Sequence, residues 1–262
     1  MEDLQPLCGL FDSHAHYDDG AFDTDREQLL KDRLPAAGVE FVLNAATDAA
    51  SIRSGRELCA RYPGFYCAAG YHPHTAKEAL PGYLSQLRED LKDPKVVAIG
   101  EIGLDYHYDL SERPIQQRVF QEQLQLAAET GYPVIIHMRE ATADTLKLLR
   151  EFRPQGVVHC FSGSAETAEE ILELGLYLGF TGLVTFANAK KAREAAARVP
   201  LDRLLIETDC PYMTPVPYRG RRNDSTLLHL TAHTIAGLKG MDPQALAEKT
   251  AQNARRLYRI LG

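Results

Sequence analysis

Short apolar or β-branched runs alternate along the chain with longer segments in which apolar side chains recur every three to four positions. The longer segments predict amphipathic helices, and Pro114–Thr130 and Ala165–Leu174 are clear cases. The short runs have the length and composition of buried strands. Eight of them are visible: Cys8–His14, Glu40–Ala45, Phe65–Gly70, Val96–Gly100, Val134–His137, Val157–Cys160, Leu176–Phe180 and Leu204–Glu207.

Strict alternation of strands and helices predicts a parallel sheet. Val96–Ile99 is apolar at every position, which is typical of a parallel strand buried on both faces. Eight such units in 262 residues match an α/β fold of the (β/α)8 TIM-barrel type, with residues 1–262 as a single domain. A doubly wound open sheet is the alternative, but no Gly-x-Gly-x-x-Gly motif opens the first helix. From Ser225 onward the pattern predicts two closing helices.

Composition limits the classes of partner. The chain is 45% hydrophobic and 25% charged, as globular proteins are, and its formal net charge of −7 argues against a broad duplex-binding surface. No apolar run approaches the roughly 20 residues that a membrane span needs, so we expect no membrane association. The five cysteines lack Cys-x-x-Cys spacing, which predicts reduced thiols and a cytoplasmic location.

Metal-competent side chains follow five of the predicted strands, at the carboxyl ends that form the functional rim of a barrel. They are His14, His16, Glu101, His137, His159 and Asp209. The opposite strand ends carry no histidine or carboxylate. Glu101 directly follows an apolar strand, where an isolated carboxylate is costly to bury. A carboxylate shared by two divalent ions about 3.5–4 Å apart would offset that cost. A salt bridge or a helix N-cap explains Asp105 better than it explains Glu101.

Candidate substrate contacts lie in loops at the same rim. His72 and His74 flank a proline after the third strand, and we expect one of them to contact a phosphate or carry a proton. Arginine forks match phosphate geometry, and tyrosines there could stack on bases. The substrate-binding candidates after the fifth and eighth strands are Arg139, Arg219, Arg221, Arg222 and Asn223, with Tyr212 and Tyr218 nearby.

Three other features carry less weight. His229 and His233 have helical spacing, but Leu230 stands where a zinc-protease helix needs glutamate. Cys160 follows His159 directly, so the two side chains should point to opposite faces. His107 lies too far past its strand for ligation.

Five segments together resemble the TatD family of metal-dependent deoxyribonucleases, in the family's order and spacing: Asp12–His16, Gly100–Asp105, His137–Arg139, His159–Gly163 and Glu207–Pro211. The resemblance implies a (β/α)8 barrel with two divalent cations. His14, His16, Glu101 and Asp209 would hold one, and Glu101, His137 and His159 the other. Mg, Mn, Zn and Ni all accept such ligands. The chain departs from the family where Ser225 replaces the proline after the loop's acidic residue.

The implied activity is 3′-to-5′ hydrolysis of single-stranded DNA, with RNA as an additional substrate, by a monomer. Asp209 would be the base that deprotonates a metal-activated water, and Glu101 the shared ligand. His72 or His74 and Arg222 would orient the phosphate. Two alternatives stay open, namely a metal-dependent hydrolase of a small amide, ester or phosphotriester, and a non-catalytic nucleic-acid-binding protein.

Overall fold

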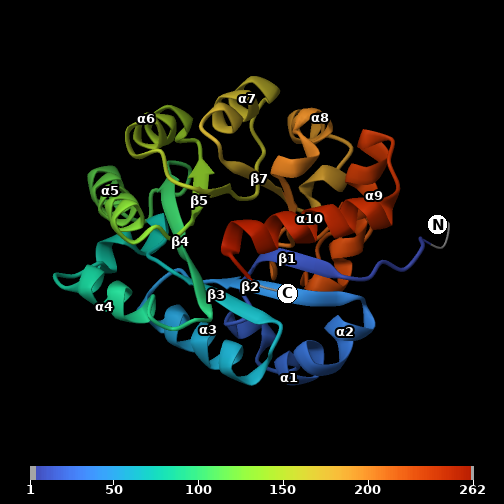
Figure 1. Ribbon diagram of the computed structural model, residues 1–262, viewed down its shortest axis with the longest axis horizontal. Helices are drawn as coiled ribbons and strands as arrows, with labels where there is room; N and C mark the ends of the chain where they lie inside the picture. Colours follow the sequence, from blue (N-terminus) through green and yellow to red (C-terminus); the bar gives the residue numbers. More distant parts are fainter. Residues whose placement is uncertain (1–3, 261–262) are drawn as a thin grey trace.

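The structure is a computed structural model that describes residues 4–260. Within this range, eight parallel strands are hydrogen-bonded in chain order and form a nearly closed barrel, which confirms the predicted architecture (Figure 1). They are β1 (Leu10–Ala15), β2 (Val39–Ala45), β3 (Phe65–Ala69), β4 (Val96–Asp105), β5 (Val134–Arg139), β6 (Gly156–Val158), β7 (Tyr177–Phe180) and β8 (Leu204–Ile206). Between the end of β8 and β1, an isolated parallel β-bridge joins Cys210 to Ala15.

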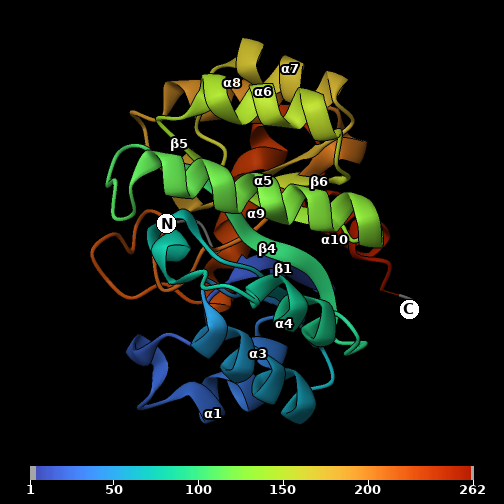
Figure 2. The same cartoon turned by 90° about the vertical axis from the view of Figure 1, so that its left-hand side faces the viewer.

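Helices surround the barrel, and Figure 2 shows α5 and α6 together on one flank. The helices are α1 (Arg26–Gln28), α2 (Leu34–Ala36), α3 (Ala49–Arg61), α4 (Tyr83–Asp90), α5 (Arg113–Thr130), α6 (Thr142–Phe152), α7 (Ala165–Glu173), α8 (Lys190–Arg198), α9 (Leu228–Lys239) and α10 (Pro243–Tyr258), with a π-helical turn (Leu29–Arg33) between α1 and α2. Short 3-10 turns are η1 (Gly20–Phe22), η3 (Pro73–Glu78), η4 (Gly182–Thr185), η5 (Leu201–Arg203) and η6 (Ser225–Leu227). No helix in the described range is long and apolar enough to cross a bilayer.

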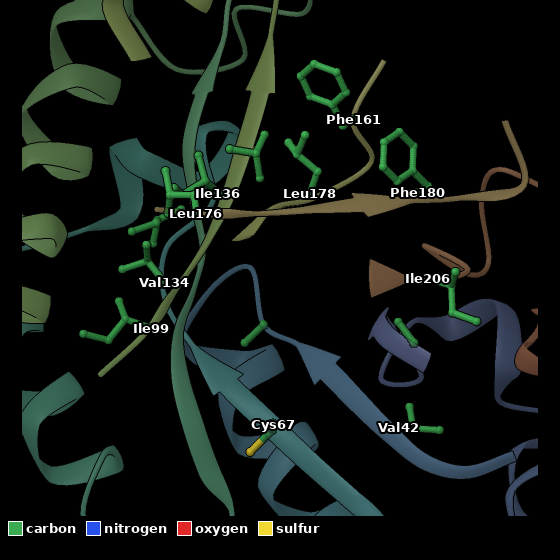
Figure 3. Close-up of a cluster of buried hydrophobic side chains, with 14 of the residues drawn as sticks. Val42, Cys67, Ile99, Val134, Ile136, Phe161, Leu176, Leu178, Phe180 and Ile206 are labelled. Atoms are coloured by element: carbon green, nitrogen blue, oxygen red, sulfur yellow. The ribbon is translucent and has the colours of Figure 1, made fainter. Parts of the chain in front are cut away.

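The core has two apolar layers because side chains alternate between the two faces of each strand. Figure 3 shows part of the layer between barrel and helices, including Val42, Ile99 and Ile206. The other layer fills the barrel interior and includes Phe11 and Tyr258 of α10, whose rings lie 6.2 Å apart. α10 therefore packs across the amino ends of the strands, and the carboxyl ends remain for a site.

Strand boundaries differ from the prediction where the site is built. β4 does not end at Gly100 but continues to Asp105, because its last four residues pair with β5. β6 ends at Val158 rather than Cys160, whose φ of 46° breaks the extended backbone. β8 ends before Glu207. The key polar residues of β6 and β8 therefore lie in the loops just beyond these strands.

Candidate metal centre

The carboxyl rim of the barrel encloses a cavity of about 670 Å³. Eight of the residues predicted from the sequence line it: His16, His72, His74, Glu101, His137, Arg139, His159 and Asp209. His14 lies beside His16 and is fully buried. The barrel thus brings all six predicted metal ligands together, although they come from distant parts of the chain.

Glu101 stands at the centre of this cluster, and its two carboxylate oxygens face different histidines. Oε1 lies 2.8 Å from His137 Nδ1 and 2.8 Å from His159 Nε2. Oε2 lies 3.2 Å from His14 Nε2 and 3.6 Å from His16 Nε2. Glu101 is therefore shared by two groups of potential ligands.

The first group is His14, His16, Asp209 and Glu101. The Nε2 atoms of His14 and His16 are 3.1 Å apart, and Asp209 Oδ1 lies 3.7 Å and 3.4 Å from them. Donors that each lie about 2.0–2.2 Å from one ion are separated by about 3–3.6 Å. His14, His16 and Asp209 therefore fit a single divalent cation, and Glu101 Oε2 lies within 3.6 Å of both histidines.

The second group is His137, His159 and Glu101. His137 Nδ1 and His159 Nε2 lie 3.3 Å apart, a separation that also suits two ligands of one ion. Within residues 4–260, no lysine or arginine forms an ion pair with Glu101 or Asp209. Because buried carboxylates need a compensating positive charge, a cation suits this nitrogen- and oxygen-rich set.

Hydrogen bonds on the outer side of two rings fix how they face the cluster. His16 Nδ1 donates to the Ala45 carbonyl oxygen at 2.8 Å. His137 Nε2 donates to Asp105 Oδ2 at 3.1 Å. A neutral imidazole that donates outward presents an unprotonated nitrogen inward, which is the form that binds a metal.

His72 is oriented in the opposite sense. The backbone N–H of His74 donates to His72 Nδ1 at 3.1 Å, so the proton of the neutral ring is on Nε2. That Nε2 lies 3.2 Å from Glu101 Oε1. Burial lowers the pKa of His72 to about 4, which favours the neutral ring. His72 therefore presents an N–H group to the cavity, whereas the His74 ring also lines the cavity but its Nε2 lies 2.8 Å from Asp105 Oδ2.

Two buried carboxylates outside the predicted ligand set support the histidines. Asp105 accepts hydrogen bonds from both His74 and His137. Glu207 accepts the backbone N–H of Cys160 at 2.6 Å, and its Oε1 lies 3.6 Å from His159 Nδ1. Glu207 is not among the site residues predicted from the sequence, although its position two residues before a rim aspartate is a usable signal.

The charge state of the central carboxylates follows from their neighbours. Burial raises the pKa of a carboxylate, but the surrounding histidines, His159 foremost, hold the pKa of Glu101 well below its usual range. Burial also opposes ionisation of Asp209, and its hydrogen bond with His16 lowers its pKa nonetheless. Both groups are therefore anionic at neutral pH, as metal ligands must be.

The basic segment after β8 lies apart from the residues that line the cavity. Arg222 forms a two-pronged ion pair with Asp25, at 2.6 and 2.7 Å. Asn223 is fully buried and donates to backbone carbonyls of its own loop. Arg219 and Arg221 lie over the rings of Phe186 and Tyr218. Their role as substrate contacts stays a prediction.

The features given less weight have ordinary local partners. His229 Nδ1 and His233 Nε2 bond backbone carbonyls, and His107 pairs with Glu140. At the departure from the family pattern, the Ser225 hydroxyl donates to Asp12, and the 3-10 turn η6 begins there without the proline.

Comparison with known protein families gives one clear match. The family model described as "TatD related DNase" matches residues 11–259. An uncharacterized metal-dependent hydrolase, YabD of Bacillus subtilis, is 44% identical over 254 residues, covering 96% of this chain and 99% of YabD. A protein of Erwinia billingiae named 3′-5′ ssDNA/RNA exonuclease TatD is 38% identical, and the match covers 96% of this chain and 99% of the Erwinia protein.

Solved structures show the same fold. YjjV, a TatD homologue from Escherichia coli, superposes with a TM-score of 0.91 at 33% identity, covering 97% of this chain and 99% of YjjV. A phosphotriesterase homology protein from E. coli, at 17% identity and a TM-score of 0.66, shares the fold alone.

Proposed function

The chain belongs to the TatD-related DNase family and is a metal-dependent hydrolase, and from this premise we propose that it removes nucleotides from the 3′ end of single-stranded DNA. The observation that carries the proposal is the position of Glu101, whose two oxygens face two separate sets of histidines. A carboxylate in this position suits two cations that share it, and paired cations of this kind are typical of enzymes that cleave phosphodiesters.

In this proposal His14, His16 and Asp209 would hold one ion, His137 and His159 would hold the other, and Glu101 would be a ligand shared by both. When bound, such cations acidify a water molecule and offset the charge that develops on a phosphoryl group.

The remaining steps belong to side chains of the chain itself. Asp209 is ionised, and its side chain is 14% exposed toward the cavity, so it can accept the proton of the attacking water. His72 Nε2–H can donate to a non-bridging phosphate oxygen as negative charge develops there. Asp105 keeps the His137 ring in its ligating orientation.

The cavity suits a single strand better than a duplex. Tyr108 and Tyr212 line it and are 52% and 57% exposed, and their exposed ring surface suits stacking on bases. The net charge of −7 disfavours the broad contact that a duplex needs. The relative from Erwinia billingiae carries the name of an exonuclease on single-stranded DNA and RNA, which supports the same substrate class.

One observation favours a second candidate, hydrolysis of a small ester, amide or phosphotriester. Asp18 and Asp19 also line the cavity. Their negative charge repels phosphates and suits a neutral or cationic substrate. The same activated water would then attack a carbonyl carbon or a neutral phosphorus centre.

Defined oligonucleotides separate these functions. Metal-stripped protein is resupplied with Mg, Mn, Zn or Ni and given 5′-labelled linear single strands, a circular single strand, a duplex, an RNA strand and a small ester. We expect a ladder that shortens from the 3′ end of linear single strands, and an intact circle. Cleavage of the circle overturns the exonuclease assignment, and turnover of the ester alone supports the second candidate.

A matched pair of variants tests whether cleavage depends on the proposed metal centre. Glu101→Ala is expected to abolish metal-dependent cleavage, whereas Glu89→Ala removes an exposed glutamate on α4 that pairs with Lys92 and is expected to leave cleavage unchanged. Full activity of Glu101→Ala contradicts the bridging role.

A further inference from the structure

A second cavity, of about 260 Å³, lies beside the metal centre between the loops that follow β5 and β6. Arg139 and His159 line both cavities, so the two are neighbours across these side chains. His159 belongs to the proposed metal centre. A substrate strand with its reacting phosphate at the metal centre would therefore continue into the second cavity.

Arg139 lies at the boundary between the two cavities, and its guanidinium is available to bind an anion. It is the last residue of β5, it is exposed, and its guanidinium lies 4.6 Å from the centre of the Tyr108 ring. Within residues 4–260 it forms no ion pair with any carboxylate, whereas the fork of Arg222 is fully used by Asp25. An aromatic ring holds the guanidinium plane without using its N–H donors.

Two hydroxyl groups add to this donor set. Thr142, at the start of α6, and Ser162, after β6, line the second cavity. Neither hydroxyl has a hydrogen-bond partner among the described residues. The acidic member of the lining, Glu140, is paired with His107 at 2.8 Å. The cavity thus offers a free guanidinium and two free hydroxyls, a combination suited to a phosphate diester.

We propose that Arg139, with Thr142 and Ser162, binds the phosphate on the 5′ side of the scissile one, and that Tyr108 contacts the nucleoside between the two phosphates. This subsite rests on the proposed nuclease function. It would make the enzyme prefer substrates with at least two phosphates, because a single phosphate at the metal centre leaves Arg139 without a partner.

Three thymidine oligonucleotides test the subsite. The dinucleotide has only the scissile phosphate, the trinucleotide adds the phosphate on its 5′ side, and a modified trinucleotide carries an uncharged methylphosphonate there. For the native chain we expect kcat/KM on the charged trinucleotide to exceed that on the modified one by about tenfold or more, as a charged hydrogen bond allows. In Arg139→Gln this preference should disappear.

Arg150→Gln is the control, because it removes an arginine from α6 that pairs with Glu170 away from either cavity. It should keep the native preference. The subsite is wrong if Arg139→Gln still prefers the charged linkage, or if it lowers all three rates equally.

Failure of the nuclease function has a different signature, namely that the native chain cleaves none of the three oligonucleotides. In that case calorimetric binding with EDTA present still decides about the subsite. A loss of the charge-dependent affinity in Arg139→Gln supports it, and equal affinities of the native chain and the variant overturn it.

Discussion

The direction of individual ring protons divides the histidines around Glu101 into different roles. His16 and His137 donate outward, to a backbone carbonyl and to Asp105, so in the neutral form that binds a metal each ring faces the cluster with a lone pair. His72 accepts a backbone N–H on its outer nitrogen and faces Glu101 with a proton. The histidines that crowd Glu101 are therefore not equivalent, and His72 is assigned the part of a hydrogen-bond donor.

Substitution of His72 tests this assignment. His72→Ala should keep the full metal content, while kcat falls about 100-fold, because a donor to the developing negative charge is lost. His72→Gln places an amide N–H near the position of Nε2 and should recover most of the rate. Metal content is measured by mass spectrometry and kcat on a single-stranded oligonucleotide. His137→Ala is the matched control and should lose metal, and the same loss in His72→Ala would make His72 a ligand.

At the scale of elements, β4 positions much of the centre. All ten of its residues are buried, and it carries both Glu101 and Asp105. Gly103 lies between them with a φ of 143°, and a Cβ atom there would lie 2.0 Å from the His137 carbonyl oxygen. Close contact between β4 and β5 at this glycine therefore sets the distance between Glu101 and His137.

Gly103→Ala should disrupt both stability and metal binding. A side chain there forces β4 and β5 apart, and we expect a loss of about 2 kcal/mol beyond that of a control glycine variant. The control is Gly175→Ala, which also has a positive φ, of 87°, but has no atom within 4 Å of the added Cβ. Denaturant unfolding and metal affinity are measured for both. Equal losses in the two variants would contradict the packing argument.

The Asp25–Arg222 pair joins the loop after β8 to the segment around α1, and it predicts a pH dependence. The hydrogen bond from Arg222 lowers the pKa of Asp25. A carboxylate with a lowered pKa adds stability above its unfolded pKa of about 3.9, and loses that contribution as the pH falls through the folded value. The stability difference between the native chain and Asp25→Asn should be at most about 1 kcal/mol and constant near neutrality.

Below about pH 4 that difference should shrink, because Asp25 becomes protonated in the native chain. Urea unfolding at several pH values measures it, and losses from other acidic groups cancel in the comparison. A difference that grows toward low pH would show that the pair does not stabilise the fold through its charge.

The sequence predicted the strands and which residues gather at the rim, since each rests on a local pattern. Apolar runs located all eight strands, and the residues after them located Glu101, His137 and His159. The orientation of His72 depends on one backbone N–H and could not be predicted.

Contacts between residues far apart in the sequence could not be predicted either. Arg222 is 197 residues from Asp25, so nothing local indicated that its guanidinium is occupied. The extension of β4 to Asp105 was missed because Gly100 and Gly103 interrupt its apolar run, whereas pairing with β5 keeps it extended. Sequence patterns located the groups, and long-range contacts determine which are free to act.

At the scale of the whole molecule, the apolar packing that stabilises the fold and the polar residues of the site lie at opposite ends of the barrel strands. The interior apolar layer and α10 close the amino ends of the strands, with Tyr258 packed against Phe11. The polar cluster collects at the carboxyl ends, where loops are free to vary. Two carboxylates that contribute to the net charge of −7, Glu101 and Asp209, lie in this cluster, so bound cations would make the active rim less negative than the formal charge suggests.

The central claim is that two ions, bridged by Glu101, are needed to cleave a phosphodiester. The most direct measurement is the initial rate of nucleotide release from the 3′ end of a single-stranded oligonucleotide, as metal is titrated into stripped protein at concentrations where binding is stoichiometric. We predict no release without metal and a rate that reaches its maximum at two equivalents per chain. A maximal rate at one equivalent, or release by the metal-free protein, would contradict the account.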